Sequence, residues 1–226
     1  MLLVLRVTEP PAARPRVKKW STGLKEALST TLVRDDTTRL VFLNLVVWGS
    51  GALVMFWVNQ KYWQVSGVPL AWFGLLLAGY NLIDGFAARS AALAVTRYGR
   101  RPMLVAVGVL PIIAYFGMAS FLGWGGILFG FLFKVGRGLG EVLFLGSLNE
   151  PIPSAFRATV ISLAQLGIRA SFCLLGPLVG YGIDAWGLPS VLSALGILFS
   201  IAFLCLLLPL ALRETAVTAK EVSHPL

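Results

Sequence analysis

Five ionisable side chains lie deep within long apolar stretches of this sequence, where an unpaired charge is costly. They are Asp84, Lys134, Arg137, Glu141 and Arg169. Lys134, Arg137 and Glu141 are spaced three and four residues apart, so an α-helix places them on one stripe. Arg137 and Glu141 can pair along that helix, which leaves Lys134 without a partner. Asp84 and Glu141 are each a candidate for proton coupling or for a structural ion pair.

Arg169 and two amide side chains extend this candidate site. Arg169 can form a buried pair with Asp84 or Glu141, or it can contact a substrate. Asn44 and Gln60 lie in the first apolar stretch, where their amides can line the same space. The sequence therefore predicts a substrate cavity lined by Lys134, Arg137, Arg169, Asn44 and Gln60.

Six apolar stretches provide the elements that would hold these side chains. The chain of 226 residues is 57% hydrophobic and 13% charged, which is more apolar surface than a soluble core of this size can bury. Each stretch is long enough to cross about 30 Å of hydrocarbon as an α-helix. We predict an all-α membrane protein with six transmembrane helices, at residues 40–60, 69–93, 102–122, 124–148, 158–181 and 189–212. The helix at 124–148 contains three charges and is marginal in lipid alone, so it needs a polar neighbour.

The positive charges orient these helices. Of the 19 lysines and arginines, fourteen lie on one side of the predicted topology, four lie inside spans, and Lys61 alone lies on the other side. Basic segments stay in the cytoplasm, so we predict an inner-membrane protein with both termini cytoplasmic. The positive charges lie between apolar segments and do not form one solvated face, which argues against nucleic-acid binding. The sequence has no motif for a nucleophile, a phosphate or a metal, so we expect neither catalysis nor a cofactor.

The ends of the chain differ in composition from its middle. Residues 1–39 are predicted to be a cytoplasmic linker with an amphipathic surface helix, residues 40–213 the six-helix domain, and residues 214–226 a cytoplasmic tail. The first residues, MLLVLRVTE, resemble LPLALRETAV at residues 208–217. We therefore expect residues 1–9 to be the end of a helix whose earlier part is missing.

Two predicted cytoplasmic connections carry charged motifs. TRYGRRPML at residues 96–104 is similar to the D-R-x-G-R-R motif of the major facilitator superfamily, with Thr96 where that family has aspartate. LNEPIPSAFRATVISL at residues 148–163 is similar to the connection before the eleventh helix of many bacterial members, with Glu150 and Arg157 as its charged pair. Over residues 40–213 the chain thus resembles the C-terminal six-helix half of such a transporter. The resemblance implies a cytoplasmic gate formed by Arg97, Gly99, Arg100, Arg101, Glu150 and Arg157.

The resemblance also implies an arrangement and a function. The first and fourth helices would line a central cavity, the second and fifth would border another half, and the third and sixth would face lipid. A small solute would then cross by alternating access with proton coupling. The expected partners are the lipid bilayer, a small-molecule substrate, and an N-terminal six-helix half or a second copy. A drug-efflux antiporter half is one alternative, and an inactive truncated fragment or a non-transporting membrane scaffold is another.

Overall fold

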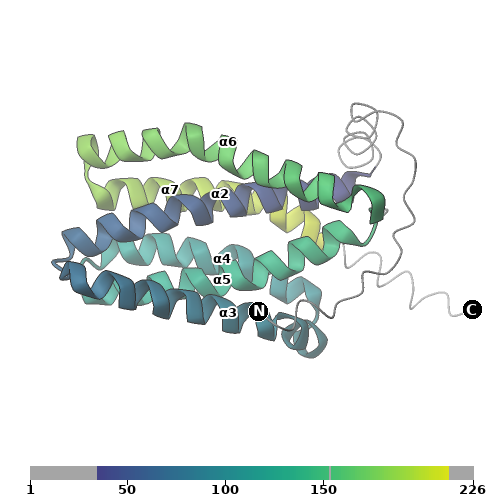
Figure 1. Ribbon diagram of the computed structural model, residues 1–226, viewed down its shortest axis with the longest axis horizontal. Helices are drawn as coiled ribbons and strands as arrows, with labels where there is room; N and C mark the ends of the chain where they lie inside the picture. Colours follow the sequence, from purple (N-terminus) through teal and green to yellow (C-terminus); the bar gives the residue numbers. More distant parts are fainter. Residues whose placement is uncertain (1–34, 153, 214–226) are drawn as a thin grey trace, which may run out of the picture.

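The computed structural model describes residues 35–152 and 154–213, which form a bundle of long antiparallel α-helices (Figure 1). Six such helices lie in these ranges: α2 (Asp36–Val65), α3 (Phe73–Tyr98), α4 (Arg100–Ser120), α5 (Trp124–Asn149), α6 (Ser154–Trp186) and α7 (Leu188–Ala202). The 3₁₀ turn Leu70–Trp72 precedes α3, and the π-helical turn Phe203–Leu207 extends α7 toward Arg213. The predicted all-α architecture with six helices is confirmed for this part of the chain. The predicted linker and tail fall almost wholly outside it.

Composition separates α5 from the other helices. The five others are long and apolar enough to cross a membrane, whereas α5 contains Lys134, Arg137 and Glu141 near its middle. A helix with three central charges gains little by entering lipid alone. The neighbours of α5 in the bundle therefore have to solvate or neutralise these charges.

Two helices extend well beyond the apolar stretches that predict them. α2 begins at Asp36, inside the segment predicted as a linker, and α6 continues to Trp186, where the sequence predicts a loop. The polar and aromatic residues at these ends are compatible with a helix, so loss of hydropathy does not end it. The turns are marked by backbone geometry instead. Four glycines with φ between +73° and +92°, where other residues are strained, lie at the connections: Gly67, Gly99, Gly123 and Gly187.

The first described helix begins at a capped N-terminus. The Asp35 carboxylate accepts hydrogen bonds from the backbone N–H groups of Thr37 and Thr38 at 3.2 and 2.9 Å. A hydrogen bond from the Thr38 hydroxyl, at 2.6 Å, is the main reason why the pKa of Asp35 is lowered. Asp36 also lies 3.8 Å from Arg213, so both ends of the described chain meet at one end of the bundle (Figure 1).

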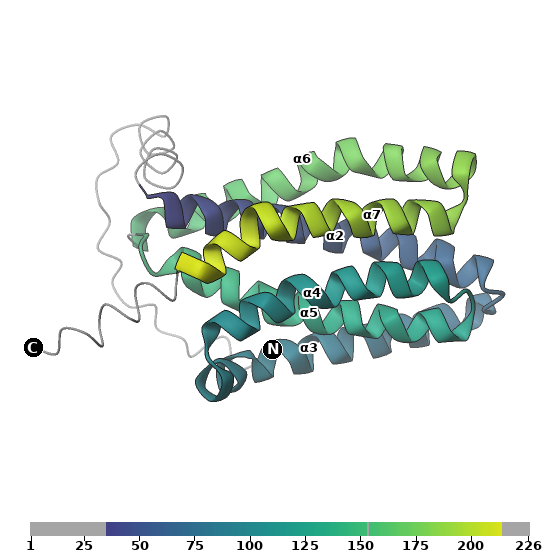
Figure 2. The ribbon, with the colours of Figure 1, turned by 180° about the vertical axis from the view of Figure 1, so that it is seen from behind.

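The interior of the bundle is built on α5. This helix packs against α3, α4 and α2, while α2 also contacts α6 and α4 also contacts α7 (Figure 2). Aromatic rings join α2, α4, α5 and α7 inside the bundle. The ring centroids of Trp48 and Tyr115 lie 5.1 and 5.3 Å from that of Phe199, and Tyr115 lies 5.5 Å from Phe133. These contacts enclose the apolar core.

The outer surface of the bundle is apolar. α3 and α6 lie at opposite edges in both views and have the smallest buried share among the five apolar helices (Figures 1 and 2). The sequence predicts lipid contact for α4 and α7, and these helices also expose apolar side chains, among them Ile113, Phe116, Ile197 and Ile201. The surface thus has the chemistry of a protein surrounded by hydrocarbon.

Glycines on α5 allow α4 to approach closely. A Cβ atom at Gly136 would lie 2.8 Å from Pro111, and one at Gly140 would lie 2.8 Å from Val107. Both distances are shorter than a real Cβ atom normally allows. The absence of a side chain at these two positions therefore lets α4 and α5 pack closely.

Gly138 has the same role toward α3. A Cβ atom at Gly138 would lie 2.3 Å from the backbone oxygen of Asp84. A side chain can rotate away from such an atom, but a backbone oxygen moves only with its helix. Glycine at this position therefore sets the distance between α3 and α5.

We expect Gly138→Ala to lower the free energy of unfolding by about 1–3 kcal/mol, because the added methyl group must push α3 and α5 apart. Unfolding of the full chain by denaturing detergent measures this loss. Gly146→Ala on the same helix is the matched control, since a Cβ atom there meets nothing within 4 Å. Equal destabilisation by the two substitutions would show that Gly138 does not set the helix spacing.

Candidate functional site

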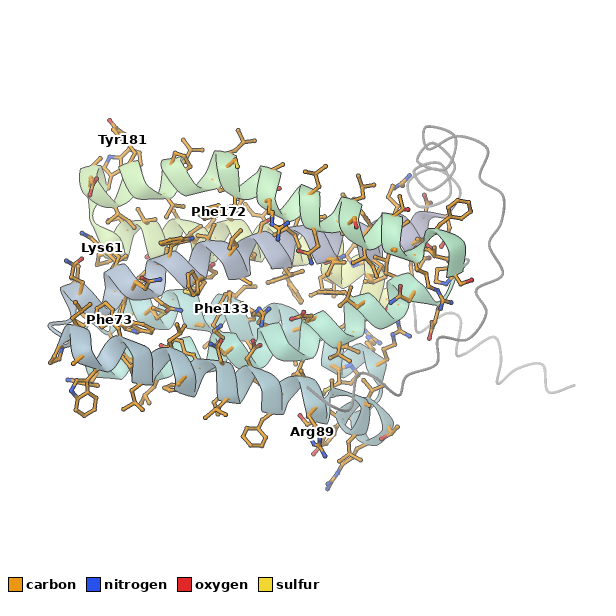
Figure 3. All side chains as sticks on the ribbon, in the orientation of Figure 1. Lys61, Phe73, Arg89, Phe133, Phe172 and Tyr181 are labelled. Carbon is orange, nitrogen blue, oxygen red and sulfur yellow. The ribbon has the colours of Figure 1, made fainter. Side chains whose placement is uncertain are left out.

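A cavity of about 370 Å³ lies between α2, α5 and α6, with α3 and α4 contributing to its wall. Four charged residues line it, and Phe133 of its wall lies near the middle of the bundle (Figure 3). At 1.5 Å per residue, Lys134 is about 15 Å from the start of α5, roughly half the thickness of the hydrocarbon core. The charged lining residues are Lys134, Arg137, Glu141 and Arg169.

Arg137 joins two carboxylates from two helices. One guanidinium nitrogen contacts Asp84 of α3, and the other lies 2.9 Å from Glu141, one turn along α5. The pair along the helix is the one that the spacing predicts, whereas the pair with Asp84 links α3 to α5. The Asp84 side chain is 12% exposed and that of Glu141 is 50% exposed. The two candidates for proton coupling therefore share one cation but differ in their access to the cavity.

Lys134 is the most deeply buried cation among the cavity residues, with a relative exposure of 8%. Its ammonium nitrogen lies 3.5 Å from the side-chain oxygen of Asn81 on α3. Within the described ranges no carboxylate oxygen lies within 4 Å of it, because Asp84 and Glu141 are both engaged by Arg137. The sequence predicts no partner for Lys134. In the structure its partner is the uncharged amide of Asn81.

Arg169 enters the cavity from α6. Neither of its two candidate carboxylates is its partner: Asp84 and Glu141 both contact Arg137 instead. Among the residues that the structure describes, Arg169 forms no hydrogen bond or ion pair. It is a solvent-accessible guanidinium at the cavity wall.

Asn44 and Gln60 do not line this cavity, so that part of the prediction is corrected. The Asn44 amide is fully buried and donates to the backbone oxygens of Leu40 and Leu206 at 2.8 and 3.1 Å. Its oxygen accepts a hydrogen bond from the Trp48 indole at 3.1 Å. Asn44 thus joins α2 to the π-helical turn after α7, and Gln60 lies four turns farther along α2.

Two polar residues of the site have no strong signal in the sequence. Asn81 and Gln165 line the cavity together with the charged residues. Asn81 lies three residues before Asp84, on the same face of α3, which is the one pattern that points to it. Gln165 lies one turn before Arg169 on α6 and is identified only once α6 is placed beside α2.

The predicted gate lies at the end of the bundle where the described chain begins and ends. Gly99 forms the turn between α3 and α4 with a φ of +85°. Arg100 donates a hydrogen bond to the Ser147 hydroxyl near the end of α5, and Ser147 in turn donates to the Leu143 carbonyl at 2.7 Å. The arginine loop is therefore tied to α5.

The remaining gate residues are more loosely held. The Arg97 guanidinium lies 5.5 Å from the centroid of the neighbouring Tyr98 ring, and Arg101 is exposed. Arg157 donates to the Ile152 carbonyl at 3.0 Å. No ion pair joins it to Glu150 in the described residues, although the two are the charged residues of the motif. The loop folds onto its own backbone instead.

No family model, curated protein or solved structure matches this chain. The resemblance to the major facilitator superfamily therefore depends on the two loop motifs and on the six apolar stretches of the sequence.

We expect Arg137→Met to lower the free energy of unfolding by about 3–5 kcal/mol, because it leaves the buried Asp84 carboxylate without its cation. Adding Asp84→Asn should restore part of that loss, since it removes the uncompensated charge. Denaturing-detergent titrations of the two single variants and the double variant form the cycle that measures this coupling. Strictly additive losses would mean that the two side chains do not stabilise each other. Glu141→Gln is the milder control, because Glu141 is half exposed.

Proposed function

We propose that this chain is a six-helix half of a membrane transporter, similar to the C-terminal half of the major facilitator superfamily, and that it carries a small solute by alternating access. The observation that carries the proposal is the cavity, which gathers Lys134, Arg137, Glu141 and Arg169 near the middle of a bundle with an apolar exterior. Charged residues at this depth are expensive, and in membrane proteins they mark substrate and ion pathways. Structural ion pairing accounts for Arg137 and Glu141, but Lys134 and Arg169 have no carboxylate in contact among the described residues.

The packing order of the helices supports the same proposal. α3 packs on α5 and α6 packs on α2, while α2 contacts α5 and α4 contacts α7. Exchanging α2, α3 and α4 for α5, α6 and α7 leaves these four contacts unchanged, whereas the extensive α4–α5 contact has only a small counterpart between α2 and the π-helical turn after α7. The two sets of three helices also begin at opposite ends of the bundle (Figure 1). An inverted repeat of three helices within a six-helix half is the architecture that alternating access uses in this superfamily.

A companion bundle is part of the proposal. Arg169 and Glu141 are solvent-accessible in this chain, and exposing them to lipid would be unfavourable. Gly176 and Gly180 on α6 have the four-residue spacing that is typical of close helix packing. No helix in the described part of the chain packs on Gly180, because a Cβ atom there would meet nothing within 4 Å. A second cavity, of about 550 Å³, lies between α2 and α6 and is lined in part by Lys61 and Phe172, whose side chains are labelled in Figure 3. An N-terminal six-helix half or a second copy would cover these features.

The proposed site assigns a role to each charged group. Glu141 takes up and releases the coupling proton, because it combines exposure to the cavity with a contact to Arg137. Asp84 keeps Arg137 in place from α3. The arginine loop from Arg97 to Arg101 lies at the cytoplasmic end in the inner membrane, where it closes the inner gate against the companion bundle.

Proton-driven uptake into liposomes tests the proposed function. We expect the full chain to accumulate at least one member of a panel of radiolabelled acids, amines and neutral solutes when a proton gradient is imposed. Glu141→Gln should abolish this accumulation but keep exchange of the same solute across the membrane, because only the proton step is removed. Arg89→Gln is the control, since Arg89 is an exposed cation of α3 that does not line the cavity.

The same assay identifies the companion. Uptake by liposomes that contain only this chain would show that a second copy of the chain is the companion bundle. Uptake that requires a separately encoded six-helix half assigns it to that protein. Absence of uptake and exchange in both preparations would contradict the proposed function.

A further inference from the structure

The charges of the cavity are unevenly compensated. Arg137 has two carboxylates, Asp84 and Glu141, in direct contact. Lys134 and Arg169 have none within 4 Å among the described residues. We call these two side chains the cationic pair. They lie on neighbouring walls of one cavity, and every carboxylate that lines or adjoins it is already bound to Arg137.

Lys134 has no carboxylate in direct contact among the described residues, and Asp84 acts on it only at longer range. The lysine side chain is among the few buried charged groups of the bundle, and Asn81 satisfies one of the three donors of an ammonium group. A charge that is removed from water without a counter-ion is strongly disfavoured. An anion in the cavity would relieve this cost more than a neutral solute would.

Arg169 supplies the matching geometry from α6. A guanidinium group presents paired N–H donors in one plane, which fit the two oxygens of a carboxylate. No side chain in the described residues occupies these donors. A carboxylate held by Arg169 would be drawn toward Lys134 by the second positive charge.

Apart from Asn81 and Gln165, the uncharged part of the wall is apolar, and the cavity limits the size of the ligand. A volume of about 370 Å³ is near the lower end of the range for small-molecule sites. The wall includes aromatic and aliphatic side chains from α2, α5 and α6, namely Trp48, Leu53, Phe56, Phe133 and Ile168. Such a wall favours an apolar body that is joined to one charged group.

We propose that the cavity binds a small organic monocarboxylate with an aromatic or aliphatic body, and that Lys134 and Arg169 hold its carboxylate. This inference rests on the proposed transport function and names its substrate class. It separates the site from that of a cation-efflux protein, because the three cations Lys134, Arg137 and Arg169 outnumber the two carboxylates in or beside the cavity, Asp84 and Glu141.

Three probes with the same body but different charge test the substrate class: 3-phenylpropionate, 3-phenylpropionamide and 3-phenylpropylamine. Isothermal titration of each into the full chain in lipid nanodiscs measures the dissociation constant. We expect the carboxylate to bind at least about tenfold more tightly than the amide, since hydrogen bonds to charged groups exceed neutral ones by that margin. The amine should bind more weakly than the amide.

Substitutions then assign the binding to the cationic pair. Arg169→Gln should weaken carboxylate binding about tenfold and leave amide binding unchanged, and Lys134→Met should have the same pattern. Arg169 has no polar partner to lose in the described residues, so its replacement should leave the melting temperature unchanged. Arg89→Gln, the matched control, should leave the dissociation constants of both the carboxylate and the amide unchanged. Equal or absent binding of the three probes, or unchanged carboxylate binding in Arg169→Gln, would overturn the proposal.

Uptake of the same probes separates this inference from the transport function on which it rests. Proton-driven uptake of the amine in preference to the carboxylate would reject the substrate class and keep transport. Tight carboxylate binding without uptake or exchange, with either companion present, would keep the anion site and reject transport.

Discussion

The contact of Arg137 with Asp84 and Glu141 is the interaction on which the interior of this bundle depends. α5 crosses the centre of the protein with three charges near its middle, and each is costly in hydrocarbon. Arg137 contacts two carboxylates at once, one from α3 and one from its own helix. The apolar exterior can exist only because this ionic set is enclosed. The position of α3 beside α5 is thus an electrostatic requirement as well as a packing result.

Different faces of α5 provide the close helix packing and the ion pairs. Gly136 and Gly140 lie against α4, where the spacing is set by Pro111 and Val107. Gly138 lies against the backbone of α3 at Asp84, next to the stripe that carries the charges. A larger residue at Gly138 would therefore disturb the ion pair as well as the helix packing. The alternation of glycines with charged residues on α5 reflects this double constraint.

The sequence predicts interactions within one helix better than those between helices. The Arg137–Glu141 pair follows from a spacing of four residues, and the number of helices follows from the length of the apolar stretches. The Asp84–Arg137 pair needs the knowledge that α3 adjoins α5, which spacing does not contain. Asn44 was assigned to the cavity because a polar residue in a span suggests a site. Its amide instead donates to the backbone oxygens of Leu206, in the π-helical turn, and of Leu40, one turn back on its own helix.

The unequal exposure of the two carboxylates links the proton to the proposed ligand. Glu141 is half exposed at the cavity, whereas Asp84 is nearly enclosed between helices. Protonation of Glu141 would remove one negative charge from the wall while Asp84 continues to hold Arg137 and the α3–α5 contact. The cavity would then become more positive without losing its shape. On the proposed function, a proton and an organic anion therefore favour each other's binding, which is the condition for moving them across the membrane together.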